Sequence, residues 1–112
     1  MSYIFIEIYN AKPSWTEKSL EEQNEYIDGV LGHVDGAQAA GVEILALGRN
    51  EAQTPHRSGY EFFCVYRVPS RTVMDKFAAQ IENAGWYEYF EQGNLAGADV
   101  EMGEFFRGHA AG

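Results

Sequence analysis

The chain has 112 residues and a formal net charge of −9, from 17 acidic and 8 basic residues. This length fits one domain with one hydrophobic core, and we assign residues 1–112 to it. The negative charge would repel a phosphate backbone, and no basic patch lies among the aromatic residues, so we expect no nucleic-acid partner.

The sequence also argues against a membrane protein. No apolar stretch approaches the roughly 20 residues needed to cross a bilayer, so we expect no membrane partner. The opening residues MSYIFIEIYN lack the basic start and long apolar run of a signal peptide. Cys64 is the single cysteine, which excludes an intrachain disulfide. We therefore expect a cytoplasmic protein.

The first predicted element is a strand, YIFIEIY, with strictly alternating side chains. Ile4, Ile6 and Ile8 project from one face, whereas Phe5 and Glu7 project from the other, together with the tyrosines at either end. Both faces of this strand therefore carry large side chains.

A helix is predicted to begin after Ser19, which forms a capping box with Glu22, and to end at Gly41. Its core stripe follows helical spacing, at Ile27, Val30, Leu31 and Val34. Three glycines lie on the opposite side of this helix, at Gly29, Gly32 and Gly36. They indicate either a bent helix or the close approach of another segment, such as the C-terminal tail.

Two further strands, 42–50 and 60–68, should pair as an antiparallel hairpin across the polar loop 51–59. Ser70 is the predicted N-cap of a second helix, which ends at Gly85. Its core stripe consists of Met74, Phe77, Ala78 and Ile81. A short fourth strand is predicted within 97–106, followed by a frayed tail.

The order β-α-β-β-α-β predicts an α+β, ferredoxin-like fold, with a four-stranded antiparallel sheet and two helices on one face. Both faces of the first and third strands carry large side chains, with Phe63 and Val65 on one face of the third and Phe62, Cys64 and Tyr66 on the other, so the uncovered face would be an apolar patch. A patch of that size is more than a monomer tolerates. We therefore expect a homodimer packed sheet to sheet.

Four stretches carry a resemblance: VEILALGRN, TPH, YEFFCVYRVP and GWYEYFEQGN. By layout, residues 3–103 resemble the dimeric α/β-barrel superfamily, in which small ferredoxin-like chains pair their sheets into a barrel. The four stretches look like a family of small bacterial proteins of that superfamily with no assigned function. Characterised members of the superfamily include cofactor-free monooxygenases, lactone isomerases, polyketide cyclases, haem-degrading enzymes and ligand binders. None of their catalytic residues maps onto this chain through a shared motif.

The sequence predicts neither a cofactor nor a metal site. It contains no glycine-rich nucleotide-binding motif. His33, His56 and His109 share no metal-ligand spacing with one another or with Cys64. Cys64, in the middle of an apolar strand, is interpreted as an inert core residue.

His56 is the candidate catalytic residue, because it follows Thr54 and Pro55 in a loop and a neutral imidazole can act as a general base. The alternative is a loop histidine bonded to a backbone carbonyl. His33 lies beside the helix glycines and is a second, lesser candidate for contact with a ligand.

Charged residues on the strands form a second candidate set. Arg49 and Arg67 can attract an anionic or enolate-like ligand, or can form salt bridges. Glu7 on a central strand needs a partner, for which either arginine is the candidate. Without a cationic partner, the pKa of Glu7 would rise and the carboxyl could act as an acid or base.

The segment AGWYEYFEQGN places a dense aromatic group directly after a helix stop. Trp86 and Phe90, four residues apart, can close the core, whereas Tyr87 and Tyr89 can direct hydroxyls toward a cavity. The candidate ligand-binding residues are Glu7, Arg49, Tyr66, Arg67, Trp86, Tyr87, Tyr89 and Asn94.

The leading hypothesis is a small protein that binds a hydrophobic or aromatic metabolite, with a cofactor-independent oxygenation, isomerisation or cyclisation as the catalytic option. The alternatives are a non-catalytic binding protein with the same pocket and a structural homodimer whose aromatic residues only pack.

Overall fold

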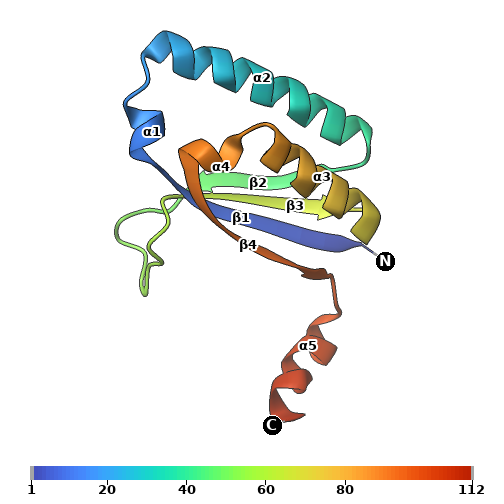
Figure 1. The fold of residues 1–112 in the computed structure, drawn as a ribbon. Helices are drawn as coiled ribbons and strands as arrows, with labels where there is room; N and C mark the ends of the chain where they lie inside the picture. The colour runs from blue at the N-terminus through green and yellow to red at the C-terminus, as the bar shows by residue number, and fades with distance from the viewer. Residues whose placement is uncertain (1, 112) are drawn as a thin grey trace.

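The computed structural model describes residues 2–111 and contains one four-stranded antiparallel sheet, in the order β2-β3-β1-β4. The elements are β1 (Tyr3–Ala11), α1 (Pro13–Thr16), α2 (Leu20–Ala39), β2 (Glu43–Arg49), β3 (Phe62–Val68), α3 (Arg71–Asn83), α4 (Trp86–Tyr89), β4 (Phe90–Ala98), α5 (Met102–Gly108) and the 3₁₀ turn η1 (His109–Ala111). The α2 and α3 helices lie on the same face of the sheet (Figure 1). The predicted α+β fold is confirmed.

The helix boundaries follow the predicted caps. Ser19 accepts a hydrogen bond from the backbone N–H of Glu22, and the Glu22 carboxylate accepts one from the backbone N–H of Ser19. Ser70 caps α3 by accepting from the backbone N–H of Val73. Gly85 has a φ of 77°, the left-handed region that glycine adopts without a steric penalty, so the chain turns there from α3 into α4.

The core lies between α3 and the sheet. Phe5 of β1 and Phe77 of α3 meet edge to face, with ring centroids 6.0 Å apart. Val68 at the end of β3 is fully buried, and Met74 of α3 is 3% exposed. The α3 helix therefore covers the sheet tightly at this end.

The prediction of the fourth strand was wrong in position. Strand β4 runs over Phe90–Ala98 and pairs with β1 along all nine residues, from Tyr3 opposite Ala98 to Ala11 opposite Phe90. Residues 102–108 form α5, which Glu101 caps by accepting from the backbone N–H of Glu104. The polar, glycine-containing stretch EQGNLAGA has low intrinsic strand preference, and its backbone pairing with β1 outweighs that preference.

The α2 helix lies over the sheet without packing tightly along its length. Of its predicted stripe, Val30 and Val34 are half-buried, whereas Leu31 is 56% exposed. No other segment approaches the glycines of α2, because a Cβ at Gly29, Gly32 or Gly36 would meet nothing within 4 Å. The expectation that the C-terminal tail approaches these glycines is therefore wrong.

The second face of the sheet, here called the open face, carries aliphatic and aromatic side chains. In register across it lie Val65 of β3, Ile6 of β1 and Leu95 of β4, and Leu95 is 58% exposed. Phe63 lies over Gly48 of β2, where a Cβ would collide with the phenyl ring. This face therefore matches the predicted apolar face.

The C-terminal helix α5 projects away from the sheet, on the side opposite α2 and α3 (Figure 1). Its apolar side chains are exposed: Met102 by 72%, Phe105 by 50% and Phe106 by 61%. Among residues 2–111, no helix is long and apolar enough to cross a membrane.

Candidate functional site

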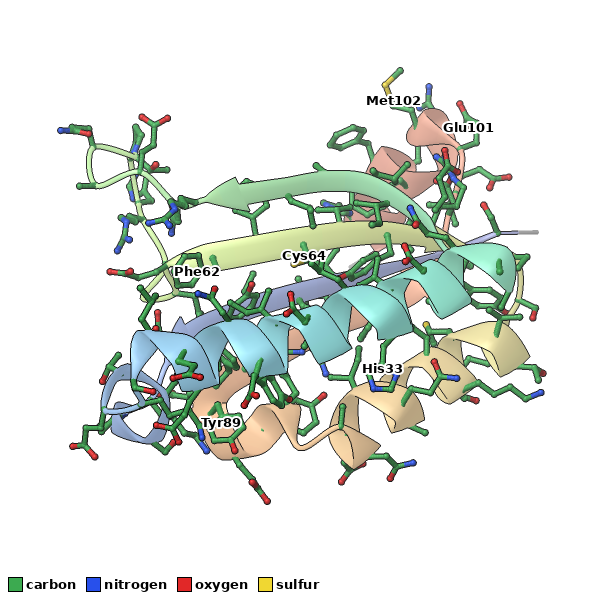
Figure 2. All side chains as sticks on the ribbon, turned by 90° about the horizontal axis from the view of Figure 1, so that it is seen from above. His33, Phe62, Cys64, Tyr89, Glu101 and Met102 are labelled. Carbon is green, nitrogen blue, oxygen red and sulfur yellow. The ribbon has the colours of Figure 1, made fainter. Side chains whose placement is uncertain are left out.

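A cavity of about 320 Å³ lies between α2, α3 and the helix-covered face of the sheet. Figure 2 looks down onto these helices, with His33 on α2 and Cys64 in the middle of β3. The lining residues come from the helices, three strands and the start of α4: Glu7, Val30, Leu31, His33, Val34, Ile44, Leu47, Cys64, Tyr66, Phe77, Gln80, Ile81, Ala84 and Trp86.

The cavity exists because α2 is held at its two ends. Near its N-terminus, the hydroxyl of Tyr26 donates to the carbonyl of Ala84 at 2.8 Å, and the Gln23 side chain donates to the carbonyl of Trp15 at 3.0 Å. Near its C-terminus, Ala37 is buried in the core. Between these ends, Val30, Leu31 and Val34 line the space above the middle of the sheet.

The mouth of the cavity opens beside β2. Leu47 of β2 is 62% exposed and Leu31 of α2 is 56% exposed, although both side chains line the cavity. His33 and Gln80 also line it and are exposed. A ligand can therefore enter between α2 and β2 without displacing the packed core around Phe77.

Glu7 is the charged group buried deepest in the wall. Its side chain, on the central strand β1, is only 4% exposed. The side-chain amide of Gln92 donates from Nε2 to Glu7 Oε2 at 2.7 Å. The indole N–H of Trp86 donates to Gln92 Oε1 at 2.7 Å and thereby fixes which end of the amide faces Glu7.

Burial raises the pKa of Glu7 above its ordinary value of 4.5, because the charged carboxylate is stripped of water. Hydrogen bonds from Tyr66 and Gln92 lower the pKa in part, but burial outweighs them. Proton transfer at this carboxyl is therefore shifted toward neutral pH.

The phenol of Tyr66 and the thiol of Cys64, also in the wall, remain protonated. Burial raises the pKa of Tyr66, the nearby carboxyl of Glu7 raises it further, and burial also raises the pKa of the Cys64 thiol. Cys64 is a free, buried cysteine, which agrees with its predicted role as an inert core residue. Tyr66 therefore presents a hydroxyl beside Glu7 rather than a phenolate.

The structure brings three of the predicted ligand-binding residues together at the cavity: Glu7, Tyr66 and Trp86. The side chain of Asn94 is linked to that of Glu7 through Gln92, whose side-chain amide donates to Asn94 Oδ1 at 2.8 Å. Its Nδ2 donates to the hydroxyl of Tyr87 at 3.3 Å. Asn94 and Tyr87 thus support the hydrogen-bond chain and do not line the cavity.

Tyr89 belongs to an aromatic cluster at the end of the molecule where α4 lies (Figure 2). Its ring lies 5.0 Å from that of Tyr26 and 5.8 Å from that of Trp15. Lys18 lies over the same ring at 4.7 Å. Trp86 and Phe90 stack at 4.0 Å, in agreement with their predicted role in closing the core.

The predicted pairing of Glu7 with an arginine is wrong. Arg67 projects from the open face, where it contacts Glu43 at 3.5 Å and Asp99 at 3.8 Å. Arg49 lies over the ring of Phe62 at 5.3 Å. Strand alternation explains the result for Arg67, because Glu7 lies opposite Cys64, so that Arg67 falls on the other face.

His56 lies apart from the cavity. It is exposed in the loop between β2 and β3 and has a φ of 53°. The histidine that lines the cavity is His33. Glu7 therefore lines the cavity, and His56 does not.

Two features of the site escaped sequence reasoning. Gln92, which holds Glu7, was overlooked because the fourth strand was expected further along the chain. The available signal was the two-residue spacing of Gln92 and Asn94, which places both on one face of a strand. The exposed position of Leu47 at the mouth could not be predicted, since an aliphatic residue in a strand is expected to be buried.

Within residues 2–111, no three histidine, cysteine, aspartate or glutamate side chains are placed to hold a metal ion. The wall is mostly apolar, and its polar side chains include Glu7, Tyr66 and Cys64 inside and His33 and Gln80 at exposed positions.

The chain matches the family of unknown function DUF6616 over residues 2–111. It belongs to that family. No curated protein matches it.

Solved structures share the fold at low sequence identity. A mutant chlorite dismutase from Candidatus Nitrospira defluvii superposes with a TM-score of 0.71 at 11% identity, covering 89% of this chain and 40% of that one. A putative chlorite dismutase gives 0.67 at 14% identity, covering 90% and 45%. A de novo designed protein, Foldit4, gives 0.51 at 15% identity, covering 88% and 98%. The chain thus spans less than half the length of either dismutase structure, and the likeness establishes the ferredoxin-like fold alone.

Proposed function

We propose that this protein binds a small hydrophobic or aromatic metabolite in the cavity between α2 and the sheet. The observation that carries the proposal is the combination of about 320 Å³ of space, a mostly apolar wall and one buried carboxyl, Glu7, held by Gln92. Small-molecule sites usually have such a wall, with few polar groups to orient the ligand.

A fluorescent probe tests the proposal. N-phenyl-1-naphthylamine is neutral and aromatic, and its emission rises when it leaves water. We expect saturable binding with one probe per chain. Val34→Phe, which places a ring in the cavity, should weaken binding at least tenfold, whereas Val100→Phe, at a site 52% exposed outside the cavity, should not. Equal binding by the two variants would refute the proposed site.

Proton transfer is the second candidate function, favoured by the position of Glu7 in the cavity wall. A carboxyl with a raised pKa can take a proton from one atom of a bound ligand and return it to another, as an isomerisation requires. In a panel of lactones and enolisable ketones, Glu7→Gln should abolish any turnover, whereas His56→Ala should leave it unchanged. Turnover that survives Glu7→Gln would exclude this role.

We propose further that a second copy of the chain covers the open face. The same chain carries both an uncovered apolar sheet face, centred on Ile6 and Val65, and a projecting helix α5 with exposed Phe105 and Phe106. A two-fold axis would place both surfaces of each copy against the other copy. Sedimentation at micromolar concentration tests this, with a 25 kDa species (about twice the 12.6 kDa chain) expected and a 12.6 kDa species contradicting it.

A further inference from the structure

The hydrogen bonds that Glu7 already makes limit those that it can offer to a ligand. Gln92 already donates to Glu7 Oε2, and the Tyr66 hydroxyl lies beside the same carboxyl. The Gln92 amide cannot turn around without breaking the bond from Trp86. What Glu7 has left to offer a ligand is a carboxyl oxygen, which accepts when ionised and carries an O–H donor when protonated.

A hydroxyl group is the ligand group that suits both forms. It donates to the carboxylate and accepts from the carboxylic acid, so the bond survives a change in the protonation state of Glu7. An ammonium group suits only the ionised form, and a bare aromatic ring adds no hydrogen bond to Glu7.

The wall also disfavours an anionic ligand. No lysine or arginine of residues 2–111 lines the cavity, because Arg67 is paired on the open face and Arg49 lies over Phe62. A carboxylate ligand would therefore lose its water beside Glu7 without gaining a lysine or arginine partner, since the basic side chain in the wall is His33, which is exposed. The chain's net charge of −9 adds to the repulsion.

We propose that the cavity selects a neutral aromatic ligand that carries a hydroxyl group, and that Glu7 is the hydrogen-bonding partner of that hydroxyl. The proposal rests on the proposed function, since it names the ligand class of the same cavity. Glu7 becomes the residue that determines specificity, while the apolar wall supplies binding that is common to all aromatic rings.

Competition against N-phenyl-1-naphthylamine tests the selectivity with four ligands that share one naphthalene ring system: 2-naphthol, naphthalene, 2-naphthoate and 2-naphthylmethylammonium. At pH 7, the naphthol should bind about tenfold more tightly than each of the other three. In Glu7→Met this advantage should vanish, while naphthalene binds as well as before. Glu82→Met, at an exposed position of α3, is the matched control and should keep the full advantage.

The outcomes separate the two claims. If the probe and naphthalene bind but naphthol gains nothing, or if naphthoate or the ammonium binds equally well, the selectivity is refuted and the cavity still stands as a binding site. If the probe itself does not bind, the proposed function fails as well. Glu7→Gln keeps a hydrogen-bonding group at the same place and should retain most of the advantage, so that a folding defect in Glu7→Met, visible by circular dichroism, does not decide the result.

Discussion

On the helix-covered face of the sheet, Glu7 is 4% exposed, whereas Leu95, the neighbouring position on the open face, is 58% exposed. A sheet with one face in water usually places its apolar side chains under the helices and its polar ones outside. Here the covered face holds polar side chains, Glu7, Gln92 and Asn94, beside its apolar core, and the open face exposes Leu95.

The buried polar groups on one face and the exposed apolar groups on the other each have a physical cost. A buried carboxyl loses hydration, and exposed aliphatic groups order water around themselves. Each cost is removed by an occupant of matching chemistry: a ligand with a polar group in the cavity, and an apolar surface against the open face. Both the proposed ligand and the proposed second copy would therefore cover a surface that is costly to leave uncovered.

The largest expected loss of stability comes from a substitution in the tightly packed end of the covered face. Phe77→Ala removes a ring that meets both Phe5 and Tyr66, and should lower the free energy of unfolding by about 3–5 kcal/mol. Leu20→Ala, at a position 74% exposed, should change it by less than about 0.5 kcal/mol. Urea denaturation measures both, and similar losses would show that the covered face has no tight core.

The open face is tested by a charge at its centre. Ile6→Glu should weaken association of two copies at least 100-fold, because the carboxylate would be buried without a partner. Leu47→Glu introduces the same charge at the mouth of the cavity on the other face and should leave association unchanged. Analytical ultracentrifugation over a range of concentrations measures the difference. Equal association of Ile6→Glu and wild type would remove the open face from any interface.

The hydrogen-bond chain of the covered face is tested at its outer end. Trp86→Phe keeps a ring but leaves Gln92 Oε1 without its donor, and should cost about 1 kcal/mol of unfolding free energy. Gln92→Leu alone should also destabilise, whereas the double variant should cost less than the sum of the two. Strictly additive losses, measured by thermal and urea unfolding, would show that the two side chains do not interact.

The smallest effect is a dependence of stability on pH. Because the pKa of Glu7 is raised in the folded state, the folded protein binds more protons than the unfolded chain above pH 4.5. The unfolding free energy contributed by Glu7 therefore falls as pH rises from 4.5 through the folded pKa.

Glu7→Gln cannot titrate and should lose this fall. The difference in stability, variant minus wild type, should increase with pH over that window and stay constant below it. Urea denaturation at a series of pH values measures it, and a difference that decreases with pH would mean that the folded pKa is lowered.

Much of the fold was accessible from the sequence because local signals agreed with tertiary structure. The alternation around Glu7, the capping box at Ser19 and the cap at Ser70 each placed an element where the structure has it. The position of β4 was not accessible in this way. Its pairing with β1 depends on backbone hydrogen bonds to a distant strand, and its own residues, such as Gly93 and Asn94, are unfavourable in strands.

The site was predictable only in part, for a geometric reason. Alternation placed Glu7 on one face of its strand without showing that the helices cover that face. The same alternation puts Arg67 with Phe63 and away from Glu7. Proximity in sequence gave no indication of which loops reach the cavity, so that His56 was favoured over His33. The space beneath α2 depends on how far that helix stands above the sheet, which its own sequence does not encode.

The most direct test of the central claim, that a ligand binds beneath α2, is a methyl NMR titration with 2-naphthol. Isoleucine and valine methyls report on both faces of the sheet in one spectrum. The account predicts shifts at Val30, Val34, Ile44 and Ile81, which line the cavity, and none at Ile4, Ile6, Ile8 and Val65 on the open face. Shifts confined to the open-face methyls, or no shifts at saturating naphthol, would contradict it.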